Sequence, residues 1–392
     1  MIASARLDAV LACVPLRDTD RIDWERIGQT ALGGLLDGMA QTPQNPVYHA
    51  EGDVLTHTKL VCEALIAERE YRETSDNAKK VLFLAALLHD IGKIRCTVLR
   101  DGALTSPRHS IVGAAMAREF LWRELGLCGI TEAQRLREAI CNLIRYHSYP
   151  PFCMIDADAE RKLLRITANG ELTPDFTLRR LCLLERADVL GRVSEDADDY
   201  LSRIAYCQAL AEELGCLDAP HAFASDFSKR AYFLGKTDWR DAELYRDSWG
   251  EVILMSGLPG TGKDTWIGAN RPDLPVVSLD AIRARLRISP TEPQGAVVAA
   301  AQEEAREHLR RHQPFIWNAT SVTAQLRRNQ ISLFESYGAS VRTQFLETSW
   351  EEELARNEGR AAVVPRGAIE RMLSKLELPE RHECETVIWS VT

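Results

Sequence analysis

Residues 251–266 read EVILMSGLPGTGKDTW and carry the most specific chemical pattern in this chain. An apolar run at 252–255 ends in a glycine-rich turn, and a helix-like segment follows. In a strand, loop and helix of this kind, backbone N–H groups turn inward around phosphate oxygens, and the lysine reaches the β- and γ-phosphates. The positive end of the following helix faces the same anion. The segment therefore predicts a site for ATP or another nucleoside triphosphate.

The residues predicted to bind the nucleotide are Gly257, Gly260, Thr261, Gly262, Lys263, Asp264 and Thr265. A Ser or Thr hydroxyl that binds Mg²⁺ ordinarily follows the lysine of such a loop. Here Asp264 occupies that position and Thr265 comes next. Because Mg²⁺ favours oxygen ligands, a carboxylate also suits it, and both residues remain candidates. The alternative interpretation is a glycine turn before an ordinary helix.

A second pattern, in the first half of the chain, consists of histidines and aspartates beside helix-like stretches. Residues 86–93 read ALLHDIGK, which places His89 and Asp90 side by side at the end of an apolar helix. The other candidates are His57, His109, His147 and Asp188. Several imidazoles with two carboxylates suit transition metals such as Mn²⁺, Co²⁺, Ni²⁺ or Cu²⁺ better than Mg²⁺ or Ca²⁺. Taken singly, each histidine has the simpler interpretation of a core or surface residue.

Length and composition limit the possible classes of protein. The 392 residues are 45% hydrophobic and 27% charged, which predicts a soluble globular chain of two domains. A net charge of -9 argues against a broad nonspecific nucleic-acid groove, although a few arginines suffice to recognise a strand end. We see neither a signal peptide nor a run long enough to span a membrane. Ten scattered cysteines without a C-x-x-C pair indicate a reducing cytoplasm.

The pattern of apolar residues changes once along the chain. Residues 1–216 are rich in apolar positions with a period near 3.6, which predicts an all-helical domain. Residues 217–249 have no clear period and are expected to connect two domains. In residues 250–392, helical stretches alternate with short apolar runs at 252–255, 276–278, 315–317, 341–346 and 387–391. This alternation predicts an α/β domain with a parallel sheet.

The second domain also carries residues suited to phosphoryl transfer. Asp280 follows the second apolar run, where a carboxylate can accept the proton of an attacking hydroxyl, and Arg283 follows three residues later. A helix N-cap is the alternative role of Asp280. Farther on, ARNEGRAAVVPRGAIERML combines arginines with a proline before a helix. We expect Arg360, with Arg356 behind it, in a lid over the phosphates. The alternative for both is a solvated helix face.

Residues 45–195 resemble the HD phosphohydrolase superfamily, whose pattern is H…HD…H…H…D. The resemblance implies one metal ion held by His57, His89, Asp90 and Asp188, and a second held by Asp90, His109 and His147. Whether one or two ions bind stays open. A metal-bound hydroxide would attack phosphorus, and Lys93 would neutralise developing charge or assist the leaving group.

The stretch NPVYHAEGDVLTHT also resembles the opening of the HD domain in bacterial CCA-adding tRNA nucleotidyltransferases, which acts on 2′,3′-phosphate ends. His49, Glu51 and Asp53 match that stretch in kind. They would orient the metal ligands from behind, or cap a helix, and the capping role is favoured for Asp53.

Residues 250–378 resemble the 5′-hydroxyl polynucleotide kinase branch of P-loop proteins in three segments, GLPGTGKDTW, LDAIR and RNEGRAAVVP. They depart from it at Asp264 and at Asn318, where the phage end-healing kinase has an acid. An HD phosphoesterase followed by such a kinase resembles the bacterial bifunctional HD-domain polynucleotide kinases.

This resemblance implies the healing of broken RNA or DNA ends. The kinase would phosphorylate a 5′-OH end with an NTP and Mg²⁺, and the HD domain would remove a 2′-, 3′- or 2′,3′-cyclic phosphate. No adenylating-lysine ligase motif is visible, so a separate ligase would seal the ends. Two alternatives remain open. One is a metabolic HD nucleotidase fused to a nucleoside or sugar kinase, and the other is a non-enzymatic NTP sensor with a structural metal site.

Overall fold

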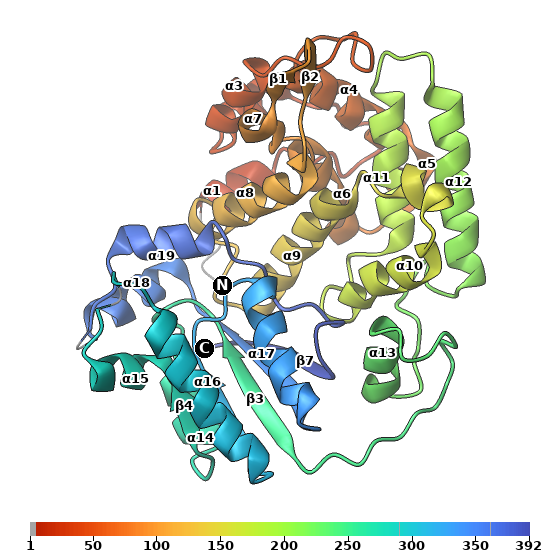
Figure 1. Ribbon diagram of the computed structural model, residues 1–392. Helices are drawn as coiled ribbons and strands as arrows, with labels where there is room; N and C mark the ends of the chain where they lie inside the picture. The colour runs from red at the N-terminus through yellow and green to blue at the C-terminus, as the bar shows by residue number, and fades with distance from the viewer. Residues whose placement is uncertain (1–4, 290, 361) are drawn as a thin grey trace. The chain divides into compact units, whose positions relative to one another are not determined.

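The computed structural model describes residues 5–289, 291–360 and 362–392. The chain divides into two compact units, Met1–His221 and Ala222–Thr392. The first is helical and the second contains a parallel sheet, as Figure 1 shows, so the predicted fold class is confirmed. Within the described part of the chain, every helix falls short of the length and apolarity that a membrane crossing requires.

The first unit is built almost entirely from helices. Its α-helices are α1 (Ala5–Leu11), α2 (Trp24–Gly28), α3 (Gly33–Ala40), α4 (Val54–Ala67), α5 (Arg69–Glu73), α6 (Asp76–Leu88), α7 (Lys93–Cys96), α8 (His109–Arg123), α9 (Thr131–Tyr146), α10 (Ala159–Thr167), α11 (Leu178–Leu190) and α12 (Ala197–Glu213). Two 3₁₀ helices are η1 (Pro150–Ile155) and η2 (Ala168–Glu171).

One small sheet departs from the predicted all-helical domain. Strands β1 (Val98–Arg100) and β2 (Ala103–Thr105) form an antiparallel hairpin. Asp101 and Gly102 connect them, and both have positive φ angles, 51° and 78°. An Asp-Gly pair adopts this conformation readily and matches the twist of the two strands, which explains the hairpin.

Helix α6 is the central element of the first unit. Ten of its thirteen residues are buried, so it is apolar on nearly every side rather than along one stripe. Helices α4, α9 and α11 all pack against it. A helix surrounded in this way holds its last residues in a fixed position, and the His-Asp pair follows directly after it.

The second unit contains a five-stranded parallel sheet. Its strands are β3 (Glu251–Ser256), β4 (Val276–Ser278), β5 (Phe315–Asn318), β6 (Ser340–Glu347) and β7 (Thr386–Val391), in the order β4-β5-β3-β6-β7. All five predicted apolar runs are strands. Strand β3 is central. The chain runs from β3 outward to the edge strand β4, returns to β5, and then crosses to β6 on the other side of β3. In such sheets ligands bind at the carboxyl ends of the strands near this reversal.

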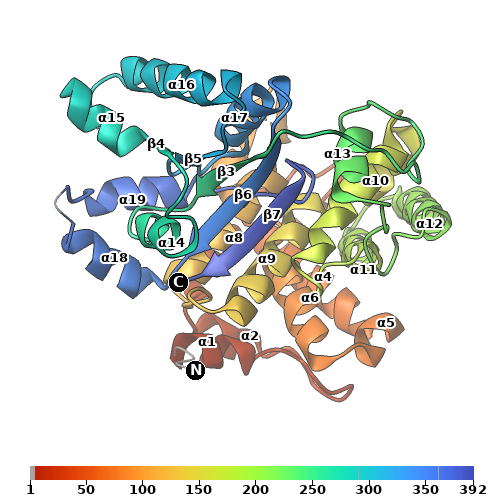
Figure 2. The same cartoon turned by 90° about the horizontal axis from the view of Figure 1, so that it is seen from below.

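Helices cover both faces of this sheet. The helices of this unit are α13 (Asp226–Phe233), α14 (Lys263–Asn270), α15 (Leu279–Leu286), α16 (Gly295–Arg310), α17 (Ala324–Ser336), α18 (Trp350–Glu358) and α19 (Arg366–Leu373). Ile267 of α14 packs with Ile253 and Met255 on one face. Phe334 of α17 packs on Phe315 on the other. Figure 2 shows α16 and α17 together on one side of the sheet.

The segment expected to connect the domains contains α13, which belongs to the second unit. Arg230 of this helix donates two hydrogen bonds to the carboxylate of Glu335, at 2.9 and 3.0 Å. Because the pair is bidentate and half-buried, it fixes α13 to α17.

Candidate functional site

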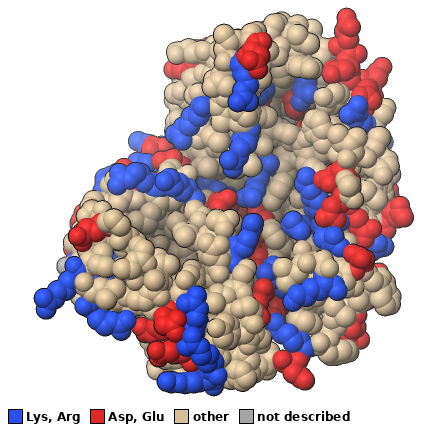
Figure 3. Space-filling model, viewed as in Figure 1, with Lys and Arg blue, Asp and Glu red and all other residues tan. Residues whose placement is uncertain are grey.

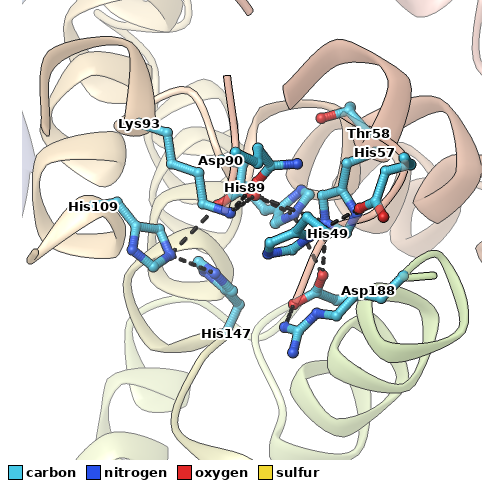
Figure 4. A network of polar contacts seen from close by, with 12 residues as sticks. His49, His57, Thr58, His89, Asp90, Lys93, His109, His147 and Asp188 are labelled. Carbon is cyan, nitrogen blue, oxygen red and sulfur yellow. Dashed lines mark hydrogen bonds and ion pairs between the residues drawn. The ribbon is translucent and has the colours of Figure 1, made fainter. Parts of the chain in front are cut away.

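The helical unit brings all six predicted metal ligands to one place, as Figure 4 shows. The positions are His57 in α4, His89 and Asp90 directly after α6, His109 at the first residue of α8, His147 directly after α9, and Asp188 in α11. Four of the five helices that supply them are packed around the central α6 or end beside it. The site therefore depends on the core of the unit and not on a flexible loop.

The ligand atoms form two groups that share Asp90. In the first, His57 Nε2 lies 3.7 Å and His89 Nε2 3.3 Å from Asp90 Oδ2. Asp188 Oδ1 joins this group at 2.9 Å from His57 Nε2.

In the second group, His109 Nε2 lies 3.4 Å from Asp90 Oδ1 and 3.3 Å from His147 Nε2. Ligand atoms about 2.1 Å from one metal ion and at right angles to each other would be about 3 Å apart. The observed spacing therefore suits one ion in each group, with Asp90 between them.

Backbone carbonyls fix the tautomers of three of the histidines. His89, His109 and His147 each place Nδ1 against a carbonyl oxygen three residues earlier, at 2.8, 3.0 and 2.7 Å. A carbonyl only accepts, so Nδ1 carries the proton in each ring. In each ring the Nε2 atom consequently faces the centre of the cluster, where it can bind a metal ion.

Several acceptor nitrogens face one another in the cluster, an arrangement that a bound cation would stabilise. The Nε2 atoms of His109 and His147 face each other at 3.3 Å, and two lone pairs repel at that distance. His89 Nε2 is buried and has no hydrogen-bond partner among the described residues. Buried polar atoms of this kind are costly unless a ligand satisfies them. The donor set, imidazole nitrogens with carboxylate oxygens, suits a divalent transition metal.

Electrostatics hold Asp90 and His147 in their binding forms. Burial alone would raise the pKa of Asp90, but the charges of Lys93 and His89 lower it well below its usual range. Burial and the neighbouring His89 lower the pKa of His147 to about 3. At neutral pH the aspartate is therefore ionised and His147 is neutral, as metal coordination requires. At His57, burial favours the neutral ring, but the carboxylates of Asp188 and Glu51 raise its pKa, so metal binding there would release a proton.

Glu51 holds two histidines from behind the cluster. Its side chain is 2% exposed, and its Oε1 lies 2.9 Å from His57 Nδ1 and 2.8 Å from His49 Nδ1. Burial would raise the pKa of Glu51, but hydrogen bonds from His57 and other donors lower it to about 2. A carboxylate bonded to the outer nitrogen of a ligand orients the ring and raises its basicity. Asp53 instead accepts from the backbone N–H of Thr56 at 2.9 Å, so the predicted cap of α4 is confirmed.

A cavity of about 340 Å³ opens onto the cluster and is lined by four of its ligands, Asp90, His109, His147 and Asp188. Lys93 is buried in its wall, with Nζ 2.7 Å from Asp90 Oδ2 and 2.6 Å from Gln44 Oε1. Arg192 donates to Asp188 Oδ2 at 2.5 Å. Two cations thus stand beside the two carboxylates, where they could also contact a bound phosphate.

The cavity also contains residues that the sequence did not reveal. Tyr48, Phe152 and Tyr200 line it, and Tyr48 and Phe152 are 53% and 44% exposed. The rings of Phe152 and Tyr200 meet edge to face, 6.4 Å between centroids. We call these three side chains the aromatic rim. Tyr48 lies in the quoted stretch NPVYHAEGDVLTHT, but the three positions are far apart in sequence and nothing in it indicated that they would meet.

Glu185 is another lining residue that the sequence did not reveal. It is 1% exposed, and its Oε2 has no partner among the described residues. Burial and the adjacent Asp188 raise the pKa of Glu185 well above its usual range. The site therefore contains one protonated carboxyl beside its ionised aspartates.

In the second unit, the predicted phosphate-binding loop follows β3 directly and leads into α14. Gly257 has φ 141°, and a Cβ there would lie 2.5 Å from the carbonyl oxygen of Leu346, so only glycine fits. The Nζ of Lys263 folds over the loop and donates to the carbonyls of Gly257 and Leu258, at 2.9 and 2.7 Å. Burial and the Arg360 charge lower the pKa of Lys263 to about 8. The lysine is held where a polyphosphate would meet it.

The predicted acceptor and lid residues converge on Asp280. Its Oδ1 is paired with Arg283, and its Oδ2 lies 3.2 Å from Arg360 Nη2. The capping alternative for Asp280 is wrong, because Ser278 accepts from the N–H of Ala281 and caps α15. The Asp280 side chain is 68% exposed, so it remains open to an acceptor hydroxyl.

The other lid arginine lies apart from this group. Arg356 is ion-paired with Glu352 at 2.8 Å on the same helix and donates to Thr392 Oγ1 at 3.0 Å. The structure thus brings Arg360 to Asp280, whereas Arg356 lies beside the phosphate-binding loop, where its Nη1 would be 3.4 Å from a Cβ at Gly262.

Residues 54–192 match the family described as the HD domain. Residues 252–379 match a family described as an AAA domain, whose P-loop fold is kinase-like. Among curated proteins, none matches this chain. The chain therefore carries an HD domain followed by a P-loop kinase-like domain.

Proposed function

Because the chain joins an HD hydrolase domain to a P-loop kinase-like domain, we propose that it heals broken RNA or DNA ends. The kinase would phosphorylate 5′-OH ends with ATP or another NTP and Mg²⁺. The HD domain would remove 2′-, 3′- or 2′,3′-cyclic phosphates. The observation that carries the proposal is that one chain contains both a kinase-like domain, which would add phosphate, and an HD domain, which would remove it. Together their products are a 5′-phosphate and a 3′-OH, the two groups that a separate ligase joins.

In the HD domain, His57, His89, Asp90 and Asp188 would hold one divalent ion, and Asp90, His109 and His147 a second. Such ions lower the pKa of a bound water and polarise a phosphoryl oxygen. Lys93 is placed to neutralise charge on the phosphate, since it already pairs with a shared ligand. Glu51 would orient the His57 ring.

The aromatic rim favours a substrate that carries a nucleobase. Aromatic side chains at the mouth of a phosphate site provide faces on which bases stack, independent of sequence. On the side of the molecule drawn in Figure 3, acidic and basic side chains are intermixed. Such a surface suits contact with a strand end better than contact with a long duplex.

In the kinase-like domain, Asp280 would accept the proton of the 5′-hydroxyl as it attacks the γ-phosphorus. Lys263 would bind the β- and γ-phosphates, and Arg360 would stabilise charge that develops during transfer. Arg283, which now pairs with Asp280, would be free to bind the phosphate next to the acceptor nucleoside.

All ten cysteines are free, and nine of them are buried. Unpaired thiols in this number support a reducing compartment, and we place the reaction in the cytoplasm.

The proposal is tested by a panel of acceptors and phosphoesters. We expect kcat/KM for phosphorylation to be at least about 100-fold higher with a 5′-OH oligonucleotide than with a nucleoside or a sugar. The 3′-phosphate of the same oligonucleotide should be removed in the presence of Mn²⁺, Co²⁺, Ni²⁺ or Cu²⁺. Equal or greater activity on nucleosides, sugars and mononucleotides would instead establish a metabolic nucleotidase and kinase. ATP binding without transfer to any hydroxyl would point to an NTP sensor.

A further inference from the structure

Two side chains at the kinase site lie in an unusual combination. Asp264 is the second residue of α14, and Asn318 is the last residue of β5, the strand beside β3. The amide Nδ2 of Asn318 donates to Asp264 Oδ1 at 2.6 Å. Asn318 is only 9% exposed, so the pair is anchored on the strand side. The bond joins residues 54 positions apart, at the edge of the sheet where the phosphate-binding loop begins.

In P-loop proteins generally, Mg²⁺ is held by a hydroxyl that follows the loop lysine and by a carboxylate at the end of the adjacent strand. Here the loop position carries the carboxylate, and the strand end carries an uncharged amide. Compared with the usual arrangement, the carboxylate is at position 264 in the loop instead of position 318 at the strand end. The two positions are in contact, so the pair still contains one carboxylate beside the expected phosphates.

Neighbouring hydroxyls do not supply an equivalent ligand. Thr261 is buried, and its Oγ1 donates to the carbonyl of Leu258 at 2.8 Å. Thr265 follows Asp264 on the helix, so its side chain points about 100° away from that of Asp264. It is exposed and makes no side-chain hydrogen bond with the described residues. Asp264 is the one of the two candidates that faces the end of β5.

We propose that Asp264 is the protein carboxylate that binds the Mg²⁺ of the bound nucleotide, and that Asn318 positions it. This inference rests on the proposed kinase function. The hydrogen bond uses Asp264 Oδ1 and the amide N–H of Asn318, which leaves Asp264 Oδ2 and the amide carbonyl of Asn318. Both are oxygen atoms of the kind that Mg²⁺ prefers. A second carboxylate at position 318 would meet Asp264 at hydrogen-bond distance and repel it, which explains why the strand end carries an amide.

The experiment compares ATP affinity with Mg²⁺ and with EDTA by calorimetry, using the full-length protein. The ratio of the two affinities measures the contribution of the metal without any catalytic turnover. We expect the ratio to fall at least about tenfold in Asp264→Ser and in Asp264→Asn, because the charged metal ligand is lost. In EDTA, both variants should bind ATP at least as well as the unaltered protein, since a negative charge near the phosphates is removed.

The double variant Asp264→Ser, Asn318→Asp restores the usual arrangement of loop hydroxyl and strand carboxylate. We expect it to recover the ratio to within about threefold of the unaltered protein. Asp273→Ser is the matched control, because Asp273 is an exposed aspartate like Asp264 but precedes β4, at the opposite edge of the sheet. Thermal unfolding without nucleotide verifies that each variant is folded.

Three results would overturn the inference while leaving the kinase function in place. The first is an unaltered protein whose ATP affinity does not depend on Mg²⁺. The second is an Asp264→Ser variant that keeps the full ratio, and the third is a double variant no better than Asp264→Ser alone. An unaltered protein that binds no ATP under either condition would instead contradict the proposed kinase function itself, and the inference with it.

Discussion

The two sites of this chain are organised in opposite ways. In the HD domain, His57, His89 and Asp90 are at most 2% exposed, and backbone carbonyls fix the proton positions of the histidines around them. In the kinase-like domain, Asp280 is 68% exposed and is held only by arginines. The first site is thus assembled before its ligand arrives, whereas the acceptor side of the second is a set of solvent-accessible ion pairs that a substrate would rearrange.

This difference follows from the chemistry expected at each site. A metal cluster needs ligand atoms at fixed distances, and a packed helical core supplies them at the cost of burying polar groups. A kinase must admit a nucleotide and an acceptor, so its charged residues lie at strand ends and on short helices near solvent. Substitutions in the first site should therefore act through geometry and metal affinity, and substitutions in the second through charge.

The largest expected effect is the separation of the two activities by Asp90→Asn. Asp90 belongs to both ligand groups, so its loss should reduce phosphate removal by about 10³-fold or more. Phosphorylation of a 5′-OH should stay within about twofold. Asp76→Asn, an exposed change on the same helix that leads to the site, is the control and should leave both activities intact. Loss of both activities in Asp90→Asn would indicate that the domains are coupled.

The reciprocal change, Asp280→Asn, should reduce phosphorylation by about 10²- to 10⁴-fold, because the general base is removed. The Kd of ATP should change by no more than about threefold, since Asp280 faces the acceptor. Asp273→Asn, with equal side-chain exposure, controls for the loss of a surface charge. If transfer survives in Asp280→Asn, another group accepts the proton.

A smaller effect is expected for Glu51→Gln, which keeps the shape of the side chain but removes the charge behind His57. Metal affinity measured by calorimetry should fall by about 10- to 100-fold. Glu63→Gln, an exposed change on α4, should have no effect. An unchanged affinity in Glu51→Gln would show that packing alone orients the His57 ring.

The aromatic rim predicts a change of about tenfold in KM. Phe152→Ala should raise the KM of a 3′-phosphorylated oligonucleotide, because base stacking contributes about 1–3 kcal/mol. The KM of p-nitrophenyl phosphate, which has no nucleobase, should not change. Tyr206→Ala is the matched control, since Tyr206 is also 44% exposed but does not line the cavity. Equal effects on both substrates would mean that Phe152 only supports the cavity.

A further effect concerns pH. The pKa of Lys263 is lowered to about 8 in the nucleotide-free protein, whereas a bound polyphosphate favours the charged lysine. Binding above about pH 8 therefore takes up a proton, and ATP affinity should fall by up to about tenfold per pH unit. The affinity of Lys263→Met should be weak and should not vary between about pH 7 and pH 9.5. A constant affinity in the unaltered protein would contradict the assignment.

Most of the fold could be predicted because its signals are local. The five apolar runs became five strands, and the long apolar stretch before His89 became the central helix α6. The ligand set was recognisable because each member stands in or beside a helix. The β1–β2 hairpin was missed although Asp101 and Gly102 carry a clear turn signal, since helical periodicity dominates the surrounding sequence.

Other features depend on contacts between distant positions and had no local signal. The bond between Asp264 and Asn318 requires that β5 lie beside β3, which only the strand order reveals. The aromatic rim unites segments that belong to no common motif. Ser278 caps α15, two residues before Asp280, for which capping was the alternative role. Helix ends are set by backbone geometry, which the periodicity of the sequence does not define.

The most direct test of end healing is whether the chain makes a broken strand ligatable. An oligonucleotide with a 5′-OH and a 3′-phosphate is incubated with ATP, Mg²⁺ and Mn²⁺, and then with a ligase that requires a 5′-phosphate and a 3′-OH. We predict joined product with the unaltered protein and none with Asp90→Asn or Asp280→Asn alone, but joining again when the two variants are mixed. An unjoined strand with the unaltered protein, in a test where pre-healed ends are ligated, would contradict the proposed function.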